Sequence, residues 1–174
     1  TKFMSKFIYK VRSDGLSVLN VSDINNRLLL ASKMMSEYSS EEILVVCRRE
    51  NGWKPAKLFG KLTGINVIAG RYPPGMLTNV AFDTFREVKL VFVVDPWPDR
   101  NVINDANKVG VPVIALADTN NEANHIDLIV PCNNKGKKSL GVVFYVLAKE
   151  YLKNRETIKK DEDLGKTLED FCAE

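Results

Sequence analysis

The feature that most constrains the fold of this chain is a series of short segments in which nearly every residue is apolar, rather than every second one. Strands of this kind must be covered on both faces, which is typical of parallel sheets enclosed by two helix layers. The pattern predicts strands at residues 16–21, 43–47, 67–69, 90–94, 111–117 and 128–130. A further strand at residues 7–11 precedes turn residues 12–15 and is predicted to form a hairpin with the next strand.

Amphipathic segments separate these strands. Apolar residues recur at helical spacing from Ile24 to Tyr38, after Ser22 or Asp23 as the capping residue. A second helix is expected between Asp99 as N-cap and Gly110 as C-cap, and a third is expected to be capped by Ser139. The alternation of strands and helices with short connections predicts a Rossmann-like or flavodoxin-like three-layer α/β/α domain with a mostly parallel sheet.

Charge divides the chain into two parts. Residues 1–160 are enough for a single α/β domain with a full core, and they carry 24 basic and 16 acidic residues, a net charge of +8. Residues 161–174 form an acidic tail with six acidic residues and one basic residue, which is expected to be either a short helix around Leu164, Leu168 and Phe171 or disordered. A basic body is consistent with a polyanionic partner, and the missing initiator Met indicates an N-terminal segment upstream.

Composition excludes several classes of protein. No segment approaches the roughly 18 consecutive apolar residues of a transmembrane helix, so no membrane partner is expected. The three cysteines, Cys47, Cys132 and Cys172, are too widely spaced for a zinc knuckle or a disulfide framework. They indicate a reducing compartment, and we expect a cytoplasmic protein.

The phosphate-binding motifs of α/β enzymes are incomplete or absent. Residues 22–27, after the first strand, contain no glycine, which argues against a dinucleotide fingerprint. Gly136-Lys137 resembles part of a P-loop, but Lys138 stands where a Ser or Thr would bind magnesium. Pro131 stands where the first glycine of that loop should be.

Candidate catalytic side chains are also few. His125 is expected at the surface, and a catalytic role would need partners that the sequence does not reveal. Asp95 and Asp118 end predicted strands, where many α/β enzymes place a catalytic or metal-binding carboxylate, but we favour turn and helix-capping roles. We predict no catalytic residue, no metal site, no cofactor and no small-molecule substrate.

Hydrogen-bond donors instead gather in loops and at a predicted helix start. Residues 133–138 contain two amides and three lysines before a helix whose N-terminal N–H groups attract anions. Residues 70–79 form a loop stiffened by two prolines, in which Arg71 can bind a phosphate, Tyr72 can stack on a base or sugar, and Thr78 and Asn79 can donate. For residues 133–138 the alternative is a solvated loop that caps the helix, and for residues 70–79 it is a rigid connection without a ligand.

Two further sets of basic residues are equally open to two interpretations. Lys54, Lys57 and Lys61 lie on one face of a predicted helix that follows Arg48 and Arg49, and they form either a solvated face or a track for a phosphate backbone. An N-terminal basic arm consists of Lys2, Lys6, Lys10 and Arg12.

These stretches, in this order, resemble the second protein of the small ribosomal subunit in its archaeal and eukaryotic form, a family whose animal member is the laminin-receptor precursor. The resemblance covers about residues 3–155 and is carried by residues 70–79, 85–87, 94–96, 112–116 and 126–135. Its most specific part is Pro131-Cys132-Asn133-Asn134-Lys135. Lys137-Lys138 and Phe144-Tyr145 replace the Ala-His and paired tryptophans of the animal proteins, so the chain resembles an archaeal-type member.

The resemblance implies a structural constituent of the cytoplasmic ribosome rather than an enzyme. It implies contacts with small-subunit ribosomal RNA and neighbouring ribosomal proteins at the head–body junction on the solvent side, and a role in late subunit assembly and translation. The alternative is a phosphate-ligand or nucleotide-binding α/β enzyme on the same fold. From charge and loop position we predict the RNA-binding residues to be Lys2, Lys6, Arg49, Lys54, Lys57, Arg71, Tyr72, Thr78, Asn79, Asn133, Asn134, Lys135, Lys137 and Lys138.

Overall fold

The computed structural model describes residues 1–159 and 164–172, which form seven strands and five α-helices in the described part of the chain. The strands are β1 (Ile8–Val11), β2 (Ser17–Leu19), β3 (Ile43–Cys47), β4 (Asn66–Ala69), β5 (Leu90–Val93), β6 (Val113–Ala117) and β7 (Leu128–Pro131). The α-helices are α1 (Val21–Ser36), α2 (Trp53–Thr63), α3 (Arg100–Val109), α4 (Lys137–Asn154) and α5 (Leu168–Cys172). Short 3-10 helices occur at Ser5–Phe7, Ser40–Glu42 and Glu50–Gly52.

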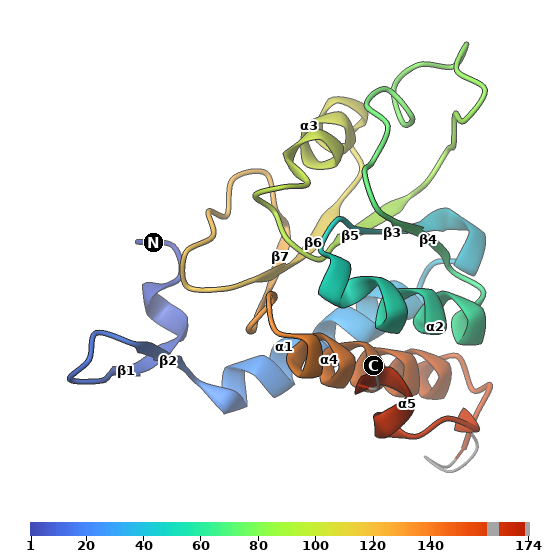
Figure 1. Ribbon diagram of the computed structural model, residues 1–174. Helices are drawn as coiled ribbons and strands as arrows, with labels where there is room; N and C mark the ends of the chain where they lie inside the picture. The colour runs from blue at the N-terminus through green and yellow to red at the C-terminus, as the bar shows by residue number, and fades with distance from the viewer. Residues whose placement is uncertain (160–163, 173–174) are drawn as a thin grey trace.

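Five of the strands form one parallel sheet in the order β4-β3-β5-β6-β7 (Figure 1). When these strands are numbered along the chain from β3, the order is 2-1-3-4-5, which is the flavodoxin-like order of a doubly wound sheet. The predicted fold class is therefore confirmed. In this topology the chain reverses its direction of travel across the sheet between β3 and β5, so a crevice is expected at the carboxyl ends of those two strands.

Helices and loops cover both faces of this sheet because its strands are apolar on both sides. Within β3, Ile43, Val45 and Cys47 pack in the core shared with α1, α2 and α4, whereas Leu44 and Val46 pack in the core shared with α3. The second core is completed by residues 70–89, a long connection without a helix that crosses the same face as α3 (Figure 1). The three layers that were predicted from the apolar runs are present.

The N-terminal hairpin confirms one prediction and corrects another. Strands β1 and β2 pair antiparallel, as predicted, but they form a two-stranded sheet apart from the parallel one. The prediction that residues 16–21 contribute to the main sheet was therefore wrong. The turn is closed by the Arg12 N–H, which donates to the Leu16 carbonyl, and by Gly15 with a φ of 83°, so β2 pairs with its neighbour in sequence.

Helix boundaries differ from the prediction where a nearby amide takes over the capping role. The N-cap of α1 is Asn20, whose side chain accepts from the Ser22 N–H, rather than Ser22 or Asp23. The N-cap of α4 is Gly136 rather than Ser139. The Asn133 side chain accepts from the backbone of Lys135 and Gly136, and this turn lets the helix begin three residues earlier.

The ends of α3 agree with the prediction in position. Gly110 is the C-cap with a φ of 74°, as expected for a left-handed residue. Asp99 is the N-cap residue, but its carboxylate accepts no hydrogen bond from the first turn and instead accepts from the Arg48 N–H. The aspartate therefore joins the end of β3 to the start of α3.

The C-terminal acidic segment is described only in part, since residues 161–163 and 173–174 lie outside the described residues. The described portion contains the short helix α5, and buried Phe171 packs edge-on against Tyr145 of α4 with ring centroids 5.7 Å apart. Gly141 allows this close approach, because a Cβ there would lie 2.9 Å from the Phe171 carbonyl oxygen. Of the two predicted alternatives, a short helix or disorder, the described portion has the short helix.

The described residues contain neither a membrane-spanning helix nor a cluster of metal-binding side chains. None of their helices combines the length and apolar character that a membrane crossing requires. Nor do the described residues contain a group of three or more His, Cys, Asp or Glu side chains positioned to hold a metal ion.

Candidate nucleic-acid interface

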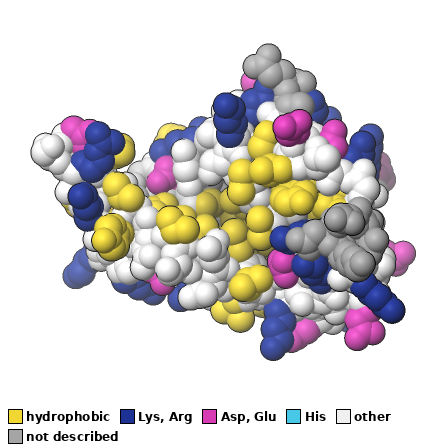
Figure 2. Space-filling model, turned by 90° about the horizontal axis from the view of Figure 1, so that it is seen from below, with side chains coloured by type: hydrophobic (Ala, Val, Ile, Leu, Met, Phe, Trp, Pro, Cys, Tyr) yellow, Lys and Arg dark blue, Asp and Glu magenta, His cyan; other side chains and the backbone are white. Residues whose placement is uncertain are grey.

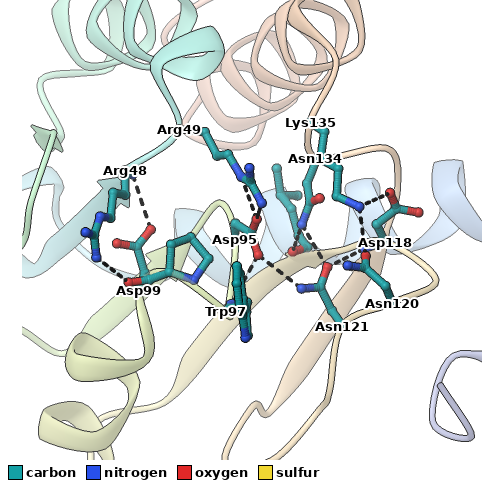
Figure 3. Close-up of polar contacts among 12 residues, drawn as sticks. Arg48, Arg49, Asp95, Trp97, Asp99, Asp118, Asn120, Asn121, Asn134 and Lys135 are labelled. Carbon is teal, nitrogen blue, oxygen red and sulfur yellow. Dashed lines mark hydrogen bonds and ion pairs between the residues drawn. The ribbon is translucent and has the colours of Figure 1, made fainter.

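An ion pair bridges the carboxyl ends of β3 and β5, where the crevice is expected. Arg48 and Arg49 directly follow β3, and Asp95 lies two residues after the end of β5. The Nε of Arg49 donates to Oδ2 of Asp95 at 2.7 Å, and the terminal nitrogen of the same guanidinium also contacts this oxygen (Figure 3). The position that binds a ligand in many doubly wound folds is thus occupied by the protein's own side chains.

Buried amides extend this ion pair into a connected set, which we call the edge network: Arg49, Asp95, Asn121 and Asn134 (Figure 3). Oδ1 of Asp95 accepts from the Asn121 side chain at 3.0 Å and from the Trp97 N–H at 3.1 Å. Oδ1 of Asn121 in turn accepts from the Asn134 side chain at 3.0 Å. Because both oxygens of buried Asp95 are already bonded, this carboxylate is poorly suited to act as a metal ligand or general base.

The titratable groups beside the edge network are shifted toward their neutral forms. Burial, with the nearby Asp95 carboxylate, raises the pKa of Asp99 to about 6, although the Arg48 N–H opposes the shift. Burial raises the pKa of Cys47 to about 12 and also raises that of Cys132. A nucleophilic cysteine needs a lowered pKa, so these two thiols are inert packing residues.

Cationic side chains from three separate parts of the chain line one open groove. Lys54, Lys57 and Lys61 come from α2, Lys137 from the first turn of α4, and Lys166 from the segment before α5. The groove has a volume of about 720 Å³ and also includes Glu50 and Asp170. We call these five lysines the lysine groove. Among the described lining residues, five lysines outnumber two carboxylates, and such a positive surface attracts phosphates.

The start of α4 adds to this positive potential instead of balancing it. A helix N-terminus carries a partial positive charge and is stabilised by acidic residues, yet the first turn of α4 contains no acidic residue and begins with Lys137 and Lys138. Its N-cap, Gly136, has no side chain to accept from the first-turn N–H groups. The arrangement is unfavourable for an isolated helix and favourable for a bound anion.

A second hollow adjoins the lysine groove. It has a volume of about 470 Å³ and shares Glu50 and Asn51 with the groove. Its other lining residues are Arg48, Arg49, Trp97, Pro98 and Lys135. The Asn51 side chain donates to the Lys135 carbonyl at 2.8 Å, which fixes the boundary between the two. Lys135 Nζ donates to Oδ1 of Asn120 at 3.1 Å and lies 3.6 Å from Asp118, so its charge is partly neutralised.

The structure therefore brings together about half of the predicted RNA-binding residues. Lys54, Lys57 and Lys137 line the lysine groove, and Arg49 and Lys135 line the adjoining hollow. Exposed Lys138 lies at the start of α4, next to Lys137, and exposed Asn133 lies in the loop before it. Asn134 is fully buried, and its amide donates to the Leu116 carbonyl and to Asn121, so we assign it to the edge network and not to a contact surface.

The predicted residues of the 70–79 loop lie elsewhere. Arg71, Thr78 and Asn79 are exposed on the connection that crosses the α3 face. Tyr72 is only 3% exposed, and its hydroxyl donates to Asp105 at 3.1 Å and accepts from the Leu77 N–H at 3.2 Å. The interpretation of Tyr72 as a stacking residue is corrected accordingly: its ring holds the loop against α3 and does not face solvent.

The two N-terminal lysines are separate from both hollows. Lys2 and Lys6 are exposed, and the Lys6 ammonium lies 5.1 Å from the centre of the Phe7 ring. Met4, between these lysines, and Phe7, directly after Lys6, are buried against Ala117 and Ile129. The N-terminal segment is thus anchored to the β6–β7 side of the sheet.

The predicted RNA-binding set lacks three residues that line the two hollows: Lys61, Lys166 and Trp97. The helical spacing of Lys54, Lys57 and Lys61 was a signal that would have justified including Lys61. Nothing in the sequence indicated that Lys166, in an acidic segment, lies opposite α2. Trp97 also lines the hollow beside Arg48, and its position between two prolines was the only available hint that it is exposed.

Comparison with known proteins identifies close relatives. A family model described as ribosomal protein S2 matches residues 81–154. The small ribosomal subunit protein uS2 of Nanoarchaeum equitans is 44% identical over 171 residues, which cover 98% of this chain and 85% of that protein. The uS2 proteins of Thermoplasma acidophilum, 42% identical over 98% of this chain and 86% of the relative, and of Methanococcus maripaludis, 46% identical over 92% and 73%, are similar as well.

Proposed function

This chain belongs to the ribosomal protein S2 family in its archaeal form, and from that premise we propose that it is a structural constituent of the small ribosomal subunit that binds ribosomal RNA. The family is one of ribosomal structural proteins and not of enzymes. We extend the proposal to the setting that the family resemblance implies: the cytoplasmic ribosome, the solvent side of the head–body junction, and late subunit assembly.

The observation that carries this proposal is the lysine groove. Its cations come from α2, the start of α4 and the segment before α5, so the fold and not a local run of lysines creates it. RNA phosphates bind such surfaces with little sequence preference, because most of the affinity comes from neutralised charge and released counterions. We assign Lys54, Lys57, Lys61, Lys137, Lys138 and Lys166 to the RNA contact, with Arg49, Asn133 and Lys135 at its border.

A second surface supports contacts with neighbouring proteins. Figure 2 shows hydrophobic side chains gathered across the middle of the face formed by α1 and α4. Leu29 and Leu30 of α1 are each 49% exposed, and Val142 of α4 is 42% exposed. Helix faces of this kind suit a protein neighbour better than a phosphate backbone.

The edge network supports the same conclusion because it argues against the alternative, an enzyme that binds a phosphate ligand or a nucleotide. A phosphate-ligand or nucleotide-binding enzyme of this fold would need open donors at the carboxyl ends of β3 and β5. Here Arg49 is paired with Asp95, and Asp95 is bonded to Asn121 and to the Trp97 backbone. We therefore assign this edge a structural role.

Two measurements test the proposal: incorporation of the protein into small subunits, and its binding to small-subunit ribosomal RNA. Lys135, Lys137 and Lys138 are replaced together by Glu, and the variant is compared with wild type in binding to small-subunit ribosomal RNA over a series of salt concentrations. We expect wild-type affinity to fall steeply with salt, and the variant to bind about a hundredfold more weakly at low salt with unchanged folding.

A matched control replaces Lys10 and Lys33, which are exposed lysines outside both hollows, by Glu. Equal incorporation of the triple variant and wild type would remove the start of α4 from the interface. A thermal shift of several degrees with a nucleotide or sugar phosphate, without RNA binding, would instead favour a small-molecule function.

A further inference from the structure

Trp97 is the most exposed tryptophan that the fold presents, and it lies at the border of the proposed RNA contact. It is 74% exposed, although tryptophan is a residue that proteins usually bury to a large extent. It occupies the connection between β5 and α3, directly after Pro96 and before Pro98. Tryptophan is enriched at binding interfaces, so an indole exposed at such a position is a candidate contact residue.

The backbone that carries this indole is fixed on both sides. The Trp97 N–H donates to Oδ1 of Asp95, and the Pro98 carbonyl accepts from the Arg48 guanidinium at 3.1 Å (Figure 3). Each proline has a fixed φ angle of its own, and Pro98 also restricts the backbone conformation of Trp97, the residue before it. A rigid aromatic side chain loses little conformational freedom when it binds, so this exposed ring is prepared for a contact.

Two hollows flank the indole, and their linings share one chemistry. The first has a volume of about 320 Å³ and contains Arg100 and the amides of Asn104, Asn120 and Asn124. The second is the 470 Å³ hollow with Arg48, Arg49, Asn51 and Lys135. Across both, the charged lining residues are four cations and two carboxylates, Glu50 and Glu122. Arg49 is already paired with Asp95 and Lys135 lies beside Asp118, so Arg48 and Arg100 provide most of the positive charge for a phosphate. Amides can bond the edges of an unpaired base, and guanidinium and ammonium groups can bind the phosphates on either side of it.

From this arrangement we propose that Trp97 is a stacking platform for an unpaired RNA base, with the flanking nucleotides held in the two hollows. The inference rests on the proposed function and goes beyond it, because it names a single-stranded nucleotide instead of a duplex backbone as the ligand at this site. Stacking on an aromatic ring is the common way in which proteins hold unpaired bases. A protein partner would favour an apolar lining, whereas these linings are amide-rich and cationic.

Fluorescence can test this assignment directly because the chain contains two tryptophans, Trp53 and Trp97. Trp53→Phe leaves Trp97 as the single indole, and Trp97→Phe leaves Trp53. Each variant is titrated with a labelled ten-nucleotide oligoadenylate and with a duplex RNA of equal length. RNA binding is followed by anisotropy of the label, and stacking by indole emission. We expect the single strand to quench Trp97 emission and the duplex to quench it much less, whereas Trp53, which lines the lysine groove, should respond alike to both RNAs.

A truncation provides the second readout. Trp97→Ala is expected to weaken single-strand binding roughly ten- to hundredfold, to leave duplex binding nearly unchanged, and to keep the wild-type midpoint of thermal unfolding. Val80→Ala, at another exposed apolar residue away from both hollows, serves as the control and should change neither. Bound RNA with unchanged Trp97 emission and unchanged affinity after Trp97→Ala would overturn the stacking proposal and leave the proposed function standing. Absence of any RNA binding would overturn both.

Discussion

The edge network and the lysine groove adjoin through the hollow beside Asn51, yet their charges are neutralised in different ways. In the edge network, Arg49 meets a buried carboxylate of the same chain. In the lysine groove, the lining that the structure describes has five lysines and two carboxylates, Glu50 and Asp170. The comparison teaches that cations neutralised within the chain hold the sheet edge together, whereas those gathered around the groove are suited to a polyanion from outside.

This contrast predicts that the two regions respond differently to mutation: the first should govern folding, and the second RNA affinity.

The largest effect is expected for Asp95→Ala. The change removes the acceptor of Arg49, Asn121 and the Trp97 N–H at once. We expect a loss of about 2–4 kcal/mol in the free energy of unfolding, somewhat below the value for a fully buried pair because Arg49 is one-third exposed. Urea unfolding measures this loss.

The control is Asp14→Ala, which breaks the exposed pair with Arg12 and should change stability by less than about 0.5 kcal/mol. Equal stability of the two variants would contradict a structural edge network.

The next effect concerns the lysine groove. Replacing Lys57 and Lys137 by Glu should weaken binding to small-subunit ribosomal RNA about ten- to hundredfold and reduce the slope of log affinity against log salt by roughly 2, because two phosphate contacts are lost. The free energy of unfolding should stay within about 0.5 kcal/mol of wild type, since both positions lie on the surface. Filter binding at several salt concentrations gives the affinity and the salt slope, and urea unfolding gives the free energy of unfolding. If Lys10 and Lys33, changed in the same way, have an equal effect, the groove is not a specific contact.

The third effect is a pH dependence that originates at Asp99. Its pKa is raised from the ordinary 3.8 to about 6, so the folded protein holds this proton more strongly than the unfolded chain does. Stability from this group is therefore lost as pH rises from about 4 to about 6, by an amount on the order of 1–3 kcal/mol. Asp99→Asn keeps an acceptor for the Arg48 N–H and does not titrate.

The variant should accordingly be more stable than wild type above pH 6, and this advantage should vanish near pH 4. Urea unfolding between pH 4 and 8 measures the difference. A wild-type protein that gains stability relative to the variant as pH rises through this window would refute the assignment.

The smallest effect is expected at Tyr72. Tyr72→Phe removes the hydroxyl that joins Asp105 to the Leu77 N–H, at a cost of about 1–2 kcal/mol in stability, while RNA affinity should not change. The matched change at exposed Tyr9 should alter neither quantity. Reduced RNA affinity without reduced stability would restore Tyr72 to the interface and show that the loop rearranges on binding.

Much of the fold was predictable because short apolar runs specify buried parallel strands directly. The sequence located β3, β5, β6 and β7 within two residues, since each is buried on both faces. It misassigned β2, because a half-buried strand in a hairpin has the same short apolar pattern as a strand of the sheet. Helix caps were misplaced where Asn20 and Asn133 provided bonds that compete with nearby serines.

The candidate interface was less predictable because it is assembled across the chain. The spacing of Lys54 and Lys57 on one helix can be read from sequence, but their convergence with Lys137 and Lys166 depends on how α2, α4 and the C-terminal segment pack. The same limit explains Tyr72 and Asn134, whose polar groups suggested exposed donors until the fold placed their partners, Asp105 and Asn121, beside them.

The most direct test of the account is sedimentation of this protein in a lysate of the cells that make it. At low salt the wild-type protein should cosediment with small ribosomal subunits, and the Lys57→Glu, Lys137→Glu double variant should shift toward the free fractions while remaining folded. Wild-type protein that stays entirely at the top of the gradient, under conditions that keep the subunits intact, would contradict the proposal that it is a structural component of the particle.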